Sequence, residues 1–268
     1  MRIGVNVTSP TNFPIAMALV RAGHAQYVEL LVDNFLHVAP AVLARDLAGV
    51  PVSFHVMNSR FFERDAVGLD ELAGRLRALA RILRPLYLSD HLARFTHEGR
   101  RLPMLLELDA ERDYAAARER VAAWQERLGE RLHIENFPSV LGDGNAQAEF
   151  YGRLVAETGC GVLFDFCNAV VAELNTGYAA TTWLPVVRAM PHFHVAGFRR
   201  TEGDPALVID SHDGPIAPET LTFMQAFERE RGGLAGLTLV VERDANIELA
   251  PWAADIQAAR RVQAGVHV

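Results

Sequence analysis

Histidine, aspartate and glutamate side chains recur near the ends of short apolar runs in this sequence. His55 lies near the end of the run 51–56, Glu135 ends the run 131–135, and His194 lies within 192–196. Imidazole and carboxylate groups together suit iron, manganese or zinc. The pattern therefore predicts a metal centre, and its candidate ligands are His55, His91, Glu135, Asp165, Asn168, His194, Asp210, His212 and Glu242.

Each of these residues has an ordinary explanation when it is taken singly. A lone histidine at a strand end usually satisfies a hydrogen bond, and a lone aspartate before a helix is usually an N-cap. Together, however, four carboxylates and four imidazoles would meet with only Arg94 and Arg243 close by in sequence. Crowding like charges is very costly unless protons or cations neutralise them. Two or three divalent ions would provide that charge.

The candidate ligands divide into three sets. One ion would take His55, His91 and Glu135; a second would take Glu135 as a bridge with Asp165, His194 and Glu242; a third would take Asn168, Asp210 and His212. Each set has fewer than six ligands, which leaves positions open for a substrate or dioxygen. Cys160 and Cys167 form no convergent thiolate zinc site, and buried apolar packing is the commoner role of such residues. A redox role for Cys167 is the alternative.

The elements that must position these side chains are short apolar runs alternating with segments of helical period. The runs show little polar alternation, as expected for strands covered on both faces, and they are 2–7, 27–31, 51–56, 86–89, 131–135, 161–166, 192–196 and 237–241. Helical stripes separate them; one spans Leu69–Leu83 and stops before Pro85, and another runs over Asp109–Leu128 and ends at Gly129.

Eight such units in about 250 residues predict an α/β fold, a (βα)8 TIM barrel of the xylose-isomerase-like class. We expect a single domain over 1–268, because no linker or repeat divides the chain. A doubly wound sheet also fits the alternation, but the first strand lacks a G-x-G-x-x-G turn. In a barrel, the carboxyl ends of all the strands open on one face, where barrel enzymes have their active sites.

Composition limits the classes of partner. The chain has 268 residues with 26 basic and 33 acidic side chains, so its net charge is −7. This balance argues against a surface that binds nucleic acid. No apolar stretch reaches the roughly 20 residues that span a bilayer, and no basic-then-apolar leader precedes the first strand. We therefore expect a cytoplasmic protein that binds neither membrane nor nucleic acid.

Five segments carry a resemblance to a known family: Leu31–Val38, Pro85–Phe95, His194–Gly197, Asp210–Asp213 and Glu242–Asp244. Through them, and from the first strand to the last, the chain resembles the multinuclear non-heme iron-dependent oxidative enzymes. Within that family it is most similar to the methanobactin biosynthesis protein B group. The ligand layout is also similar to the trinuclear site of endonuclease IV-type barrels. Asn168 stands where that group usually has a histidine, which would weaken the third site.

The resemblance implies an oxidation of a ribosomally made precursor peptide. Relatives of this kind convert a cysteine and its preceding amide into an oxazolone with a neighbouring thioamide, using dioxygen. It implies two or three irons in a mixed Fe(II)/Fe(III) state. It also implies a partner subunit of the methanobactin biosynthesis protein C type, which holds the leader of the peptide in a heterodimer.

Asp244 is the candidate catalytic residue, as the proton acceptor for the amide that cyclises. It lies two residues beyond the ligand Glu242. The alternative is that its carboxylate orients a metal-bound histidine or Arg243.

Three other functions remain as alternatives. The first is a zinc phosphodiesterase of the endonuclease IV type acting on damaged DNA, although the sequence offers no basic groove. The second is a divalent-metal sugar isomerase or epimerase, for which the Asp210-x-His212 loop would be surplus. The third is a metal-loaded subunit that binds a peptide without catalysis, although the open coordination positions favour an enzyme.

Overall fold

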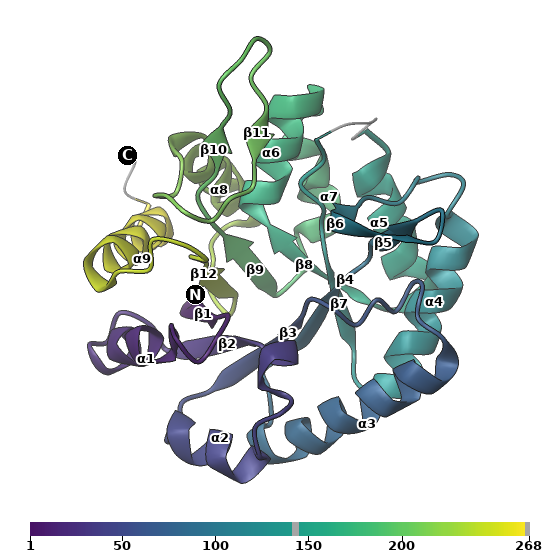
Figure 1. Cartoon of the computed structure of the whole chain (residues 1–268). Helices are drawn as coiled ribbons and strands as arrows, with labels where there is room; N and C mark the ends of the chain where they lie inside the picture. Colours follow the sequence, from purple (N-terminus) through teal and green to yellow (C-terminus); the bar gives the residue numbers. More distant parts are fainter. Residues whose placement is uncertain (141–144, 266–268) are drawn as a thin grey trace.

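Eight parallel strands form a closed barrel in this computed structural model, which describes residues 1–140 and 145–265 (Figure 1). Around the barrel the strands follow the order β1-β12-β9-β8-β7-β4-β3-β2. Their bounds are β1 Arg2–Val7, β2 Tyr27–Leu31, β3 Val52–Val56, β4 Leu88–His91, β7 Leu132–Glu135, β8 Gly161–Asp165, β9 His192–Val195 and β12 Thr238–Val241. The predicted TIM barrel is confirmed; all eight strands overlap the predicted runs, and β4 is shifted by two residues from the predicted 86–89.

Helices follow the strands and surround the barrel (Figure 1). The α-helices are α1 Phe13–Arg21, α2 Pro40–Leu47, α3 Ala66–Leu83, α4 Tyr114–Leu128, α5 Asn145–Thr158, α6 Phe166–Thr176, α7 Leu184–Val187, α8 Pro218–Arg231 and α9 Leu249–Gln263. Two 3-10 helices are η1 Val32–Phe35 and η2 Ala180–Trp183. None of the helices within the described ranges has the length and apolar character of a membrane span. The predicted domain, 1–268, includes residues 141–144 and 266–268, which lie outside the described part of the chain.

Helix α4 begins later than the sequence predicted. The expected helix started at Asp109, but the helix starts at Tyr114. The Asp109 carboxylate accepts hydrogen bonds from the backbone N–H groups of Glu111 and Arg112, at 3.2 and 2.8 Å. An aspartate that binds nearby backbone in this way competes with helix formation, so a separate turn precedes the helix.

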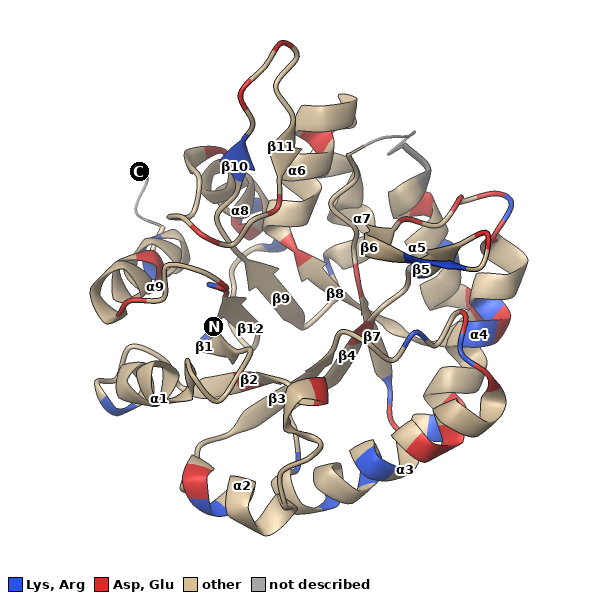
Figure 2. Cartoon of the chain, viewed as in Figure 1, with Lys and Arg blue, Asp and Glu red and all other residues tan. Residues whose placement is uncertain are grey.

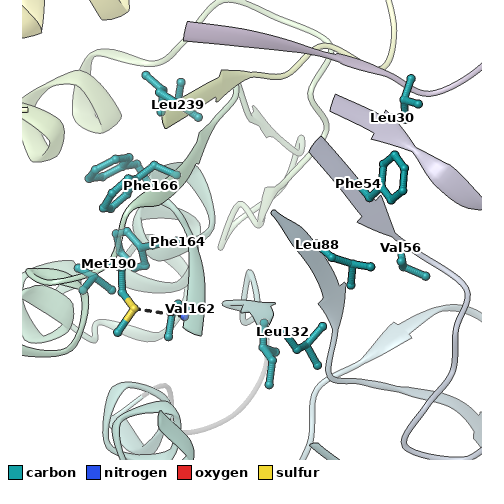
Figure 3. Close-up of a cluster of buried hydrophobic side chains, with 14 of the residues drawn as sticks. Leu30, Phe54, Val56, Leu88, Leu132, Val162, Phe164, Phe166, Met190 and Leu239 are labelled. Atoms are coloured by element: carbon teal, nitrogen blue, oxygen red, sulfur yellow. Dashed lines mark hydrogen bonds between the residues drawn. The ribbon is translucent and has the colours of Figure 1, made fainter. Parts of the chain in front are cut away.

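The apolar core lies between the barrel and the helices. Outward-facing strand residues such as Phe54, Leu88, Leu132 and Phe164 are buried in it, and Figure 3 shows part of this cluster around Phe166 and Met190. In β3 the residues that alternate with these, Ser53 and His55, are also buried. Because both faces of the strands are covered, the sequence shows no simple polar alternation.

The inside of the barrel is polar below its mouth. The rings of Tyr87 and His192 stack with centroids 4.0 Å apart, and those of His133 and His192 meet edge to face at 4.6 Å. Two glycines make room for this layer, because a Cβ atom at Gly4 would meet the ring of Tyr27 and one at Gly161 would meet the ring of His133. The lower barrel is thus filled by aromatic and imidazole rings beneath the candidate ligands.

Two short hairpins stand on the carboxyl-end side of the barrel and were not predicted (Figure 1). One pairs β5 Arg94–His97 with β6 Arg100–Leu106, and the other pairs β10 Arg199–Arg200 with β11 Val208–Ile209. Glu98 and Gly99 both have positive φ angles, of 49° and 75°, as a tight two-residue hairpin turn requires. Most residues of β6 are exposed, so the hairpin lacks the apolar run that marks a buried strand.

Candidate metal centre

Strand register brings the candidate ligands side by side at the carboxyl ends of the barrel strands. His91 of β4 is paired with Glu135 of β7, and Asp165 of β8 is paired with His194 of β9. His91 is the last residue of β4 and not, as expected, a residue of the following loop. All four side chains therefore face the same mouth.

The first predicted set forms one compact group. Donor atoms of His55, His91 and Glu135 all lie within 4.8 Å of one another. Glu135 Oε2 is 3.3 Å from His55 Nε2 and 2.9 Å from His91 Nε2. The three residues of the first predicted set are thus brought together and could hold a metal ion, and their role as ligands stays a prediction.

Hydrogen bonds behind the two imidazoles leave the Nε2 lone pairs free. His55 Nδ1 lies 2.8 Å from Ser89 Oγ, which itself donates to the carbonyl of Phe54. His91 Nδ1 lies 3.2 Å from the carbonyl oxygen of Val56. Since a carbonyl can only accept, Nδ1 of His91 carries the proton in its neutral ring. The Nε2 lone pair and the carboxylate oxygen of Glu135 repel each other unless a proton or a cation lies between the two atoms.

The second predicted set forms another group around the same glutamate. Donor atoms of Glu135, Asp165, His194 and Glu242 lie within 4.8 Å of one another, and all four residues are buried. His194 Nδ1 is 3.3 Å from Glu135 Oε1 and 3.2 Å from Glu242 Oε2. One oxygen of Glu135 faces each group, which is the arrangement of a bridging carboxylate.

The electrostatics of these groups reflect the crowding. Burial alone would lower the pKa of His91, but the hydrogen bond and charge of Glu135 raise it to about 9. Burial, reinforced by the negative charges of Asp210, Glu135 and Glu242, raises the pKa of Asp165 well above its usual range. Protons thus neutralise the cluster in the absence of cations, and a bound metal ion would replace them.

The third predicted set is only partly assembled by direct contacts. His212 Nε2 lies 2.7 Å from Asp210 Oδ1, and Cys167 Sγ donates to the same oxygen at 3.5 Å. This places Asp210 beside the first turn of α6, which also carries Asn168. The Asn168 amide donates to the carbonyl of Asn136 at 2.9 Å and leaves its own Oδ1 buried. The three residues share a neighbourhood, and their role as ligands stays a prediction.

Asp244 contacts the third set directly. Its Oδ2 is 3.1 Å from His212 Nδ1, and its Oδ1 accepts a hydrogen bond from Asn6 Nδ2 at 2.8 Å. Burial would raise the pKa of Asp244, but the hydrogen bond and charge of His212 lower it. This geometry agrees with the alternative reading, in which the carboxylate orients a metal-binding histidine. Arg243 instead pairs with Asp255 at 2.6 Å.

Glu29 of β2 belongs to the site and was missed. It is 1% exposed, and its Oε1 lies 2.6 Å from His194 Nε2. Burial would raise the pKa of Glu29, but the charge and hydrogen bond of His194 lower it. The sequence carried a signal, since a glutamate in the middle of the apolar strand Tyr27–Leu31 must be buried with a partner.

Unsatisfied atoms test whether a cation fits here. Among the described residues, the buried side-chain atoms without a hydrogen bond include Asp165 Oδ2, Asn168 Oδ1, His194 Nδ1 and Glu242 Oε2. Two of them, His194 Nδ1 and Glu242 Oε2, contact each other at 3.2 Å, whereas a buried polar atom with no partner at all costs about 1–3 kcal/mol. His212 Nε2 is also among these atoms, so five of the nine predicted ligands present a donor atom without a hydrogen bond. A mixed imidazole and carboxylate set suits iron, manganese or zinc. The residues fit a metal cluster.

The comparison with known families agrees with this geometry. A family model described as "RiPP precursor modification enzyme MbnB/TglH/ChrH" matches residues 4–264. The chain belongs to the MbnB/TglH/ChrH family. A UPF0276 protein of Rhizorhabdus wittichii is 32% identical over 243 residues, covering 87% of this chain and 85% of that relative. A UPF0276 protein of a Caulobacter species is 36% identical over 187 residues, covering 66% of this chain and 65% of that relative.

Solved structures of other proteins share the fold of this member of the MbnB/TglH/ChrH family. D-psicose 3-epimerase superposes with a TM-score of 0.64 at 15% identity, over 99% of this chain and all of that one. A xylose isomerase-like TIM barrel protein of Mycobacterium smegmatis, in complex with magnesium, gives 0.66 at 14% identity, over 99% and 98% of the two chains. These similarities confirm the xylose-isomerase-like class of barrel.

Proposed function

We propose that this member of the MbnB/TglH/ChrH family is an iron- and dioxygen-dependent oxidase of a ribosomally made precursor peptide. Its substrate would be a cysteine and the preceding amide, converted to an oxazolone with a neighbouring thioamide, as in methanobactin-type copper-chelator biosynthesis. The observation that carries the proposal is the buried Glu135, which faces both ligand groups of a chain whose family modifies such precursors.

The protein side of the reaction follows from the ligand sets. Iron bound by these residues would supply dioxygen binding and electron transfer. His55 and His91 would hold one ion with only one carboxylate, Glu135, whereas Asp165, Glu242 and the shared Glu135 would supply three carboxylates to the other. Both sets have fewer than six ligands, so the mouth can accept a substrate thiolate, which is a soft ligand.

The overall balance needs no external reductant. Forming the oxazolone and thioamide removes four electrons and four protons from the cysteine and its amide. One dioxygen molecule takes them up and leaves as two molecules of water. The amide proton must go to a base at the mouth, and Asp244, 3.1 Å from His212, is the candidate for this step; orienting His212 is the alternative role of its carboxylate.

The partners are part of the proposal. A cysteine-containing precursor with a leader would be presented by a partner subunit of the methanobactin biosynthesis protein C type, forming a heterodimer in the cytoplasm. The family description supports action on a precursor peptide. The net charge of −7 agrees with a substrate other than nucleic acid.

Metal analysis and mass spectrometry together test the proposal. Protein purified without oxygen should contain two to three irons per chain, and co-expression with neighbouring genes should give a cysteine-containing peptide that has lost four hydrogen atoms per modified residue. Glu135→Gln should abolish the mass change, whereas Glu107→Gln, at a carboxylate that contacts Gln147, should keep it. An unmodified peptide in the presence of iron and dioxygen would contradict the proposal.

A second candidate is a divalent-metal sugar epimerase. It is favoured by the barrel class, because solved structures of this class include proteins named as sugar epimerases. That reaction would use one or two ions, and the contact between Asp210 and His212 would have no part in it. Epimerisation of a free sugar by iron-free, manganese-loaded protein would support it.

A further inference from the structure

Glu29 is a charged group buried inside the barrel below the predicted ligands. It is paired in register with Ser53 of the neighbouring strand, and Ser53 Oγ donates to Glu29 Oε2 at 3.0 Å. Both residues are at most 1% exposed. A carboxylate in such a place is strongly destabilising unless a partner compensates it. One hydroxyl donor does not balance a full negative charge.

The other oxygen of Glu29 meets an imidazole from a strand that is not adjacent. Glu29 Oε1 lies 2.6 Å from His194 Nε2, and among the described residues neither atom has a hydrogen bond elsewhere. The opposite ring nitrogen of His194, Nδ1, faces Glu135 and Glu242. His194 therefore directs one nitrogen to the candidate metal position and the other to Glu29.

The chemistry of imidazole assigns the proton between them. A neutral ring that gives the Nδ1 lone pair to a metal ion carries its hydrogen on Nε2. Glu29 Oε1 is then the acceptor of that hydrogen. A carboxylate behind a metal-binding histidine fixes the ring and makes it a more basic ligand.

The two imidazoles of the first set lack such a group. His55 is backed by the Ser89 hydroxyl and His91 by a backbone carbonyl, which are both neutral. The first set also contains one carboxylate, Glu135, whereas the second contains three. The ligands at the two positions thus differ in charge, and Glu29 increases that difference through His194.

We propose that Glu29 is a positioning residue that makes the second position, formed by Glu135, Asp165, His194 and Glu242, hold the oxidised iron of the pair. The position of His55, His91 and Glu135 then holds the reduced iron. Greater negative charge around an ion stabilises its higher oxidation state, and hydrogen bonding to a ligand tunes the same balance. This inference rests on the proposed iron centre but not on the identity of the peptide.

Two substitutions with opposite expected effects test the role of Glu29. Glu29→Gln keeps the size of the side chain and removes its charge, so the reduction potential of the second iron should become more positive. Iron affinity, measured against a competing chelator, should fall about 10- to 100-fold. Ser53→Ala removes the donor to Glu29, leaves a more basic carboxylate, and should shift the potential to a more negative value.

The control is Glu107→Gln, the same chemical change at a partly buried carboxylate bonded to Gln147. It should leave potential and affinity unchanged, and circular dichroism should show all variants folded. Mössbauer spectra of the two variants should then be compared. The ferric signal that changes in Glu29→Gln should be the signal that is absent from Glu242→Ala.

Specific outcomes would overturn the inference. One is a reduction potential of the second iron that is unchanged in Glu29→Gln. Another is a shift of that potential in Glu107→Gln as large as the shift in Glu29→Gln. If Glu29→Gln does not fold, a potential that stays constant in Ser53→Ala overturns it as well. These measurements use no peptide, so a protein that shows the shifts but oxidises no peptide would refute only the proposed function. A native chain that binds no iron would refute both.

Discussion

At the scale of single residues, the site depends most on Glu135. Its Oε2 faces His55 and His91, and its Oε1 faces His194. Burial would raise the pKa of this carboxyl, but its contacts with the three imidazoles lower it well below the usual range. A group that is ionised and shared by two ligand sets should affect both metal positions at once.

Substitutions at His91 and Glu135 should separate the two positions. We expect His91→Ala to lose about one iron per chain, because it removes one of three ligands from the first set. Glu135→Ala should lose about two, because it removes the bridge. Both should remain folded by circular dichroism, with metal measured by mass spectrometry. Equal and unchanged iron contents in the two variants would disprove the ligand assignment.

Asp244 offers a test between orienting and proton-accepting roles. Asp244→Asn removes one acceptor from a residue that binds both His212 and Asn6. If it orients His212, the most weakly held iron should bind about 10-fold less tightly. Equilibrium dialysis against a chelator measures this loss. Full iron binding combined with lost activity would instead identify Asp244 as the proton acceptor.

At the scale of elements, the sequence predicted the strands and helices that a continuous run of neighbouring residues identifies. The eight barrel strands were found because each is a continuous apolar run between helical segments, and the nine candidate ligands were read from the ends of those runs and from the segments that follow them. The β5–β6 hairpin was missed because its residues are largely exposed, and the start of α4 was displaced because Asp109 forms its own turn. Glu29 was missed because its partner, His194, lies on a strand distant in sequence.

One glycine substitution in a barrel strand, with another in an outer helix for comparison, tests how the barrel accommodates its polar interior. A Cβ atom at Gly161 would collide with the ring of His133, which is itself packed by His192, so Gly161→Ala should lower the free energy of unfolding by about 1–3 kcal/mol. Gly74 in α3 has open space around it, so Gly74→Ala should raise that energy by about 0.5–1 kcal/mol.

Urea denaturation of both glycine variants gives the comparison directly. Opposite signs are expected, since the first change crowds the barrel and the second only favours the helix. A stability that is unchanged or increased in Gly161→Ala would mean that the ring of His133 can move aside.

At the scale of the whole molecule, charge is arranged in two ways. On the outer helices α3 and α4, arginines are mixed with Asp and Glu, as Figure 2 shows. In the barrel mouth, four predicted ligands, Glu135, Asp165, His194 and Glu242, are buried together with no Lys or Arg among them. The outside thus offers no uniform basic surface on these helices, while the mouth concentrates negative charge that metal ions would balance.

The most direct test of the cluster is anomalous diffraction at the iron edge from crystals loaded with iron in the absence of oxygen. We expect two strong peaks, one in contact with His55, His91 and Glu135 and one in contact with Glu135, Asp165, His194 and Glu242. A weaker third peak beside Asp210 and His212 would complete the predicted set. An iron-loaded crystal with no peak at the barrel mouth would contradict the account.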